Sequence, residues 1–109
     1  MTTVLDFSKA KKPTLPIKFP DNSVIHVYTP SKRMLEQLLS IKDQLDGAAQ
    51  NDPDSINQLY DIAARLMSNN KTGRQMTGDE LGEMLDVGDI VTFFRVYTEF
   101  INELSAVKN

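Results

Sequence analysis

The sequence predicts a mainly α-helical fold: a small helical domain of about four helices with an N-terminal β-hairpin. The strongest observation is segment 86–104, where apolar side chains recur at steps of three and four residues. A second is segment 15–28, where apolar and polar residues alternate on both sides of a turn sequence. The chain of 109 residues is long enough for one hydrophobic core but not for two, so we expect a single domain over 1–109.

The N-terminal part is expected to be a flexible arm over residues 1–14, followed by the hairpin over residues 15–28. Pro16 has no N–H to donate to a ladder, so the first strand is expected at the edge of the sheet. A lone hairpin is marginal in water, and it must therefore pack on helices or pair with another chain. Four hairpin residues are candidates for self-association: Ile17, Phe19, Val24 and His26.

Residues 29–109 are expected to form the helical body, and its first two helices open with the same pair of residue types. Thr29 would cap the first helix, with Pro30 at the first helical position, where a missing N–H has no cost. Asp52 and Pro53 repeat this arrangement at the start of the second helix.

The last two helices are predicted from carboxylates near their starts. Thr77 and Glu80 have the spacing of a capping box before a short third helix. Asp86 is expected to cap the fourth and central helix, with Asp89 placed favourably near the positive helix end. Gly88 weakens continuity between the two, so we expect a bend over residues 86–88.

Composition and charge limit the classes of function. The sequence has no membrane-length apolar run, no signal-peptide pattern and no cysteine, which fits a reducing cytoplasm. Residues 1–33 carry a net charge of +4 and residues 34–109 a net charge of −7, which suggests head-to-tail contact between copies as well as ordinary solvated surfaces. Nucleic-acid binding is disfavoured, because the basic part is short and has few rings for stacking.

No catalytic or metal-binding pattern is present. His26 is the single histidine and stands in a strand pattern, which favours surface packing over catalysis. Asp52, Asp54 and Asp61 lack the central glycine and terminal glutamate of a calcium loop, and helix capping explains the first two better. We therefore expect no enzyme, no catalytic residue, no metal ligand and no cofactor.

What remains as a functional feature is apolar surface on the last two helices. Methionines near the central helix are deformable and could adapt to an apolar helical partner, although they are more usually core residues. Val91, Val96 and Val107 lie outside the main apolar stripe of that helix. The pattern leaves open whether the stripe is core or binding surface, and its candidate partner-binding residues are Leu81, Met84, Leu85, Phe93, Phe94, Tyr97, Phe100 and Ile101.

The order of these parts also resembles a known family. A polar arm leads to a strand pair at 15–21 and 24–28, a Thr-Pro helix start follows, and the chain ends in an acidic, leucine-rich segment and the aromatic run 93–101. From about residue 5 onward, this arrangement resembles the tail assembly chaperones of long-tailed, siphovirus-type phages and prophages of Gram-positive bacteria.

The resemblance implies a non-enzymatic assembly factor of the host cytoplasm that is absent from the mature virion. Such proteins coat the helical, apolar-striped tape-measure protein until tail-tube subunits polymerise around it. They tend to self-associate as homo-oligomers, and many have a longer, frameshifted form that recruits the tail-tube protein. The residues themselves leave open a small phage or bacterial adaptor, or a head–tail completion protein, that binds one partner, and a nucleic-acid-binding regulator as a third possibility.

Overall fold

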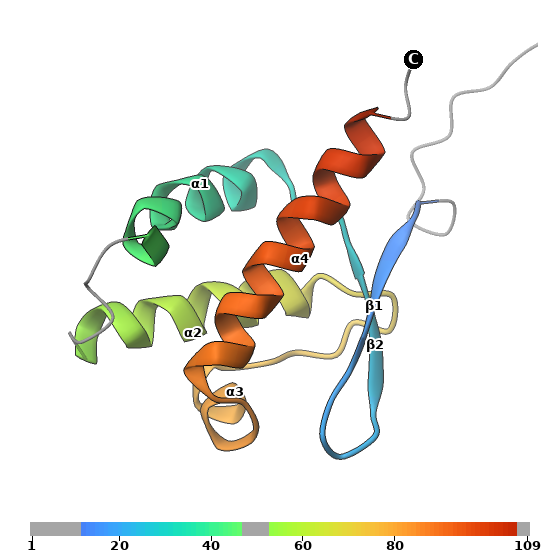
Figure 1. Cartoon of the computed structure of the whole chain (residues 1–109). Helices are drawn as coiled ribbons and strands as arrows, with labels where there is room; N and C mark the ends of the chain where they lie inside the picture. The colour runs from blue at the N-terminus through green and yellow to red at the C-terminus, as the bar shows by residue number, and fades with distance from the viewer. Residues whose placement is uncertain (1–11, 47–52, 107–109) are drawn as a thin grey trace, which may run out of the picture.

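A computed structural model describes residues 12–46 and 53–106 of the chain, with no side-chain description for 42–46 and 105–106 (Figure 1). It confirms the predicted fold class, a mainly α-helical domain with an N-terminal antiparallel hairpin. The described elements are β1 (Thr14–Lys18), β2 (Val24–Tyr28), α1 (Lys32–Asp46), α2 (Pro53–Ser68), α3 (Gly78–Met84) and α4 (Val87–Ala106). Most of the predicted arm, residues 1–11, lies outside the described residues.

The hairpin turn forms as its sequence predicts. The backbone N–H of Phe19 donates to the Ser23 carbonyl over 2.8 Å, and Asn22 takes the left-handed conformation with φ of 73°. The Asp21 carboxylate accepts bonds from the Ser23 hydroxyl at 2.6 Å and the Ser23 N–H at 2.9 Å. These two bonds, the hydroxyl's first, hold the pKa of Asp21 below its ordinary value.

A third segment supports the hairpin. Beyond β2, the N–H of Tyr28 donates to the Asn69 carbonyl over 2.9 Å, and the N–H of Lys71 donates to the His26 carbonyl over 3.0 Å. The stretch just after α2 therefore covers the outer edge of β2. The hairpin gains the support that a two-stranded sheet needs, and β1 is left as the open edge.

Asn70 holds this covering segment in shape from inside the protein. Its side chain is only 6% exposed. The amide nitrogen donates to the carbonyls of Met67 at 2.7 Å and Arg74 at 2.8 Å. The amide oxygen accepts from the N–H groups of Thr72 and Arg74 and from the Thr72 hydroxyl. A buried polar group is tolerated here because both ends of the amide are bonded.

The first helix begins later than its sequence predicts. Helix α1 starts at Lys32, and Ser31 is its cap: the Ser31 hydroxyl accepts from the Met34 N–H over 3.3 Å. The predicted start at Thr29 and Pro30 is therefore wrong. Thr29 is instead held next to the end of β2, because its carbonyl accepts a bond of 3.2 Å from the Asn69 side chain.

The other helix starts agree with the sequence. Pro53 is the first residue of α2, while Asp52 lies outside the described residues. Thr77 and Glu80 form a reciprocal capping box at α3, with both bonds at 3.1 Å. Asp86 and Asp89 form the equivalent pair at α4, with bonds of 2.8 and 3.1 Å.

A break separates α3 from α4, although it lies slightly before the predicted bend. Leu85 ends α3 in an extended conformation, with φ of −125° and ψ of 140°. Gly88 then belongs to the first turn of α4. The break lets α4 cross α2 and pass beside the hairpin (Figure 1).

The core lies where α2, α4 and the inner face of the hairpin meet. Helix α4 contributes Ile90, Phe93, Phe94 and Tyr97, none of them more than 7% exposed. The rings of Phe93 and Tyr97 stack with their centroids 5.3 Å apart. The apolar stripe of the central helix is therefore mainly core in its first half.

Candidate partner-binding groove

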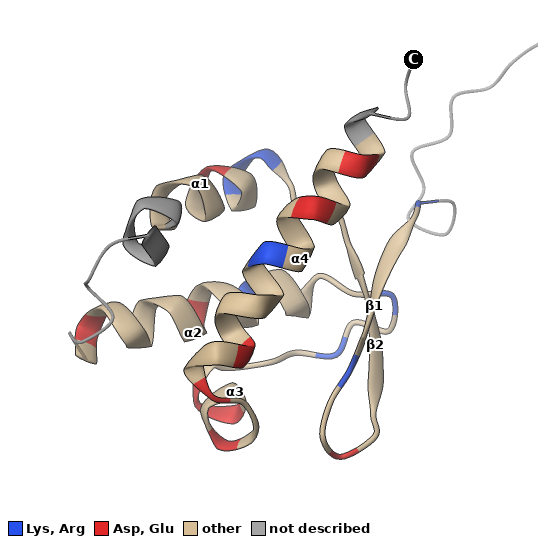
Figure 2. Cartoon of the chain, in the orientation of Figure 1, with Lys and Arg blue, Asp and Glu red and all other residues tan. Residues whose placement is uncertain are grey.

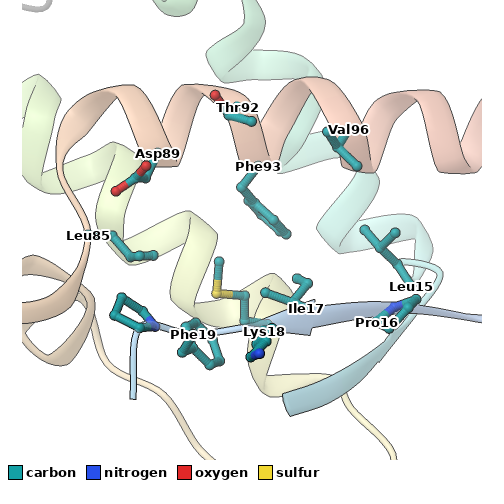
Figure 3. Close-up of a pocket in the computed structure, with 12 residues that line it drawn as sticks. Leu15, Pro16, Ile17, Lys18, Phe19, Leu85, Asp89, Thr92, Phe93 and Val96 are labelled. Carbon is teal, nitrogen blue, oxygen red and sulfur yellow. The ribbon is translucent and has the colours of Figure 1, made fainter. Parts of the chain in front are cut away.

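An open groove lies between β1 and the first half of α4, with a volume of about 500 Å³ (Figure 3). We call it the β1–α4 groove. Its strand side carries Leu15, Ile17 and Phe19, and its helix side carries Asp89, Thr92 and Val96. The close-up shows the Phe93 ring reaching from the helix toward Ile17, across the bottom of the groove.

The bottom of the groove is closed by core side chains. Phe93 is 7% exposed, Phe19 2% and Met67 1%. By contrast, Val96 on the helix side is 37% exposed. Leu15 and Ile17 are partly buried against the core. The groove is therefore an apolar surface that the fold leaves uncovered without opening the core.

The register of the hairpin explains which strand side chains face the core beneath the groove. Ile17 pairs with Ile25 and Pro16 pairs with His26. Because side chains alternate along a strand, Leu15, Ile17 and Phe19 share the inner face, while Pro16 and Lys18 point the other way and line the groove from the edge of β1.

The free edge of β1 is interrupted by a proline. The backbone bond from Phe19 to Ser23 places the odd-numbered residues of β1 toward β2, so the backbone groups of Thr14, Pro16 and Lys18 point away from the sheet. Pro16 has no N–H, and the middle of this edge therefore cannot donate to an added strand.

One charge lies on each side of the groove. Lys18 is on the strand side and Asp89 on the helix side. Acidic residues lie on α3 and at the start of α4, so that end of the groove is the more negative one (Figure 2). A partner with an apolar stripe and a basic flank would suit this arrangement.

Leu85 is fixed at the negative end of the groove by a tyrosine. The Tyr60 hydroxyl on α2 donates to the Leu85 carbonyl over 2.8 Å. Burial first, and then the nearby carboxylates of Asp86 and Asp89, raise the pKa of Tyr60. A tyrosine is protonated at neutral pH even at its ordinary pKa of 10.0, and this shift keeps the hydroxyl a donor to still higher pH.

The predicted partner-binding residues divide into two groups. Leu81, Phe93, Phe94 and Tyr97 are buried, whereas Met84, Leu85, Phe100 and Ile101 are partly exposed at the edge of the core. Of all eight, Leu85 and Phe93 line the β1–α4 groove. Contact of the buried group with a partner stays a prediction, and in this conformation their role is to hold the fold together.

The four predicted self-association residues do not share one surface. Ile17 and Phe19 lie on the inner face of the hairpin. Val24, which is 48% exposed, and His26 lie on the outer face. A contact between copies through all four would therefore need both faces of the hairpin at once.

Three other observations bear on function. A polar hollow between α2 and α3 is lined by Tyr60, Asp61, Asp79 and Glu83, among others. Among the described residues, no group of three or more His, Asp or Glu side chains is placed to hold a metal ion. Within the same ranges, none of the helices has the length and apolarity needed to cross a bilayer.

The sequence pattern pointed to Val96 as apolar surface but could not pair it with Leu15, because that pairing depends on how α4 crosses the hairpin. Val91 is equally exposed at 38%, but it lies outside the groove. Val107 lies outside the described residues.

Comparison of the chain with protein-family models, with curated proteins and with solved structures finds no match.

Proposed function

We propose that this chain is a non-enzymatic protein-binding factor of the tail assembly chaperone type. It would hold the apolar stripe of a helical tape-measure protein in the β1–α4 groove until tail-tube subunits polymerise. It would act in the host cytoplasm, as a homo-oligomer, and would be absent from the finished virion. The kind of client comes from the resemblance of the sequence, and the groove offers a place for that client to bind.

One observation carries the proposal: the groove is apolar and open, while the core beneath it is closed. A partner can therefore bind without any part of the fold having to open. The volume of about 500 Å³ lies within the range of binding sites, roughly 300–1,000 Å³. Apolar side chains on both sides suit an amphipathic helix, which binds by inserting residues spaced one turn apart.

The strand edge favours a helix over a strand as the occupant. An added strand needs a continuous row of backbone donors and acceptors. Pro16 interrupts that row at the middle of β1. A helix satisfies its own backbone bonds and requires only the side chains of Leu15, Ile17 and Val96.

A matched pair of substitutions on α4 tests the proposal. Val96, which lines the groove, is 37% exposed, and Val91, which does not, is 38% exposed. Val96→Asp should abolish the ability of the protein to keep a co-expressed tape-measure fragment soluble, because it places a charge in the apolar groove. Val91→Asp should retain this ability, since it adds the same charge to the same helix outside the groove. Circular dichroism and thermal melting would establish that both variants fold.

The outcomes separate the proposal from its alternatives. If both variants fail to keep the tape-measure fragment soluble, or if both succeed, the groove is not the binding site. Native mass spectrometry of the complex gives the stoichiometry: many copies per client fit a chaperone, whereas a single copy or a fixed ring fits an adaptor. A frameshifted longer form, if made, should add the tail-tube protein to the complex.

A further inference from the structure

A second apolar hollow lies at the far end of α4, and it is separate from the β1–α4 groove. It has a volume of about 420 Å³ and is formed by Pro13, Pro30, Leu35, Ile101 and Leu104, with Lys12 at its rim. Leu35, Ile101 and Leu104 are only partly buried. The proposed client groove does not account for this surface.

We infer that the hollow is the binding site of the chain's own N-terminal segment, residues 4–11. Lys12 already lines the hollow, so the chain enters at its rim. The segment before it contains three apolar side chains, Val4, Leu5 and Phe7. Four residues lie between Phe7 and Lys12, and the five steps that join the two can span about 17 Å when extended, which is enough to turn back over Ile101 and Leu104.

Charge favours the same occupant. Lys9 and Lys11 lie in this segment, within three residues of the hollow along the chain. The second half of α4 carries the exposed carboxylates of Glu99 and Glu103 and has no basic residue in its last turn (Figure 2). The carboxyl end of a helix also favours cations. Folding back would bring both lysines to an acidic helix end whose last turn has no basic residue.

The segment occupies the hollow of its own chain and not that of a second copy. A segment joined to its site by about four residues has an effective concentration in the millimolar range. A second copy would have to exceed that concentration to compete. The inference does not rest on the proposed client or on the groove.

Paramagnetic relaxation tests this inference in the full chain. Because the sequence has no cysteine, Thr3→Cys gives a single site for a nitroxide label next to Val4. We expect the methyl resonances of Ile101 and Leu104 to lose intensity, while those of Val24 near the hairpin turn keep theirs. Adding Leu5→Ser and Phe7→Ser should restore the lost intensity, and so should Glu99→Lys with Glu103→Lys. Glu83→Lys, on α3, should not restore it.

A mixed sample distinguishes the chain's own segment from a neighbour's. In it, isotope-labelled chains without the nitroxide are combined with nitroxide-labelled chains without the isotope. The inference requires that Ile101 and Leu104 keep their intensity in the mixture. Loss of intensity in the mixture would assign the hollow to a second copy, and no loss in either sample would leave the segment elsewhere. Either result overturns the inference.

Discussion

The Tyr97 hydroxyl on α4 donates a hydrogen bond of 3.0 Å to the backbone carbonyl of Tyr28, 69 residues earlier at the end of β2. Tyr97 is fully buried. The bond joins the hairpin to the helix that crosses beside it, and these are the two elements between which the β1–α4 groove lies. It therefore helps to set the spacing of the groove as well as the stability of the fold.

Tyr97→Phe tests the energetic part of this relationship. The substitution keeps the ring and its stacking on Phe93 but removes a buried donor. We expect the free energy of unfolding to fall by about 1–2 kcal/mol, as for other buried hydrogen bonds, in urea denaturation followed by circular dichroism. Thr98→Ala, which removes only a bond within α4 to the Phe94 carbonyl, is the control and should change it less. If the two variants lose the same free energy of unfolding, the bond from Tyr97 to Tyr28 stabilises the fold no more than a bond within α4.

The same tyrosine predicts how stability depends on alkaline pH. Burial raises the pKa of Tyr97 above its ordinary value of 10.0. Above pH 10.0 the tyrosine of the unfolded chain loses its proton while that of the folded chain keeps it. The unfolded state then binds fewer protons than the folded state, so the free energy of unfolding falls as pH rises. Urea denaturation between about pH 8 and pH 11 should show this fall, and Tyr97→Phe should reduce its slope. We expect a smaller fall to persist in Tyr97→Phe, because the pKa of Tyr60 is also raised. An unchanged slope in this variant would mean that Tyr97 does not contribute to the fall in stability.

Local sequence patterns predicted the elements of the fold, and long-range pairing decided the details that they missed. The capping box of Thr77 and Glu80 could be predicted because its partners are three residues apart. The start of α1 could not, because Thr29 is held by Asn69, far along the chain. Asn70 gave no sign of burial, since its five hydrogen bonds join it to residues no more than four positions away, and its burial comes from the packing of the segment against β2.

The candidate site could be predicted only in part. Periodicity identified Leu85 and Phe93 because it finds the apolar stripe of a helix. It could not say that Phe94 and Tyr97 turn into the core while Val96 borders a groove, since that depends on where the hairpin meets α4. Leu15 belongs to the predicted hairpin, and nothing local in the sequence connects it to the helix.

The β1 edge gives a prediction about association between copies. Pro16→Val would restore an outward N–H between those of Thr14 and Lys18 and make the edge a better template for pairing. We expect an increase in concentration-dependent association over the original protein in sedimentation velocity. Thr14→Val is the control, because it raises strand propensity without adding a donor. If both variants associate alike, apolarity and not the restored N–H is the cause.

The covering segment of the hairpin should depend on the amide of Asn70. Asn70→Asp keeps the shape of the side chain but replaces its NH₂ group, which donates to the Met67 and Arg74 carbonyls, with a carboxylate oxygen. This buried oxygen would be repelled by the two carbonyl oxygens. We expect a loss of about 2–4 kcal/mol in the free energy of unfolding, from urea denaturation at neutral pH. Asn69→Asp, which removes one side-chain bond to Thr29, should cost less. A comparable loss in the two would contradict the central position of Asn70.

Two glycines in α3 should respond in opposite directions to the same substitution. Around Gly82 there is nothing within 4 Å of an added Cβ, so Gly82→Ala should stabilise the protein by about 0.5–1 kcal/mol by lowering the freedom of the unfolded chain and favouring the helix. At Gly78 an added Cβ would clash with the Asp61 carboxylate and lie 3.3 Å from the Asp61 backbone nitrogen, so α2 and α3 would have to separate slightly. Gly78→Ala should therefore lower the melting temperature, and Gly82→Ala should raise it, in differential scanning calorimetry. A rise for both would show that the contact between Gly78 and Asp61 is looser than the structure places it.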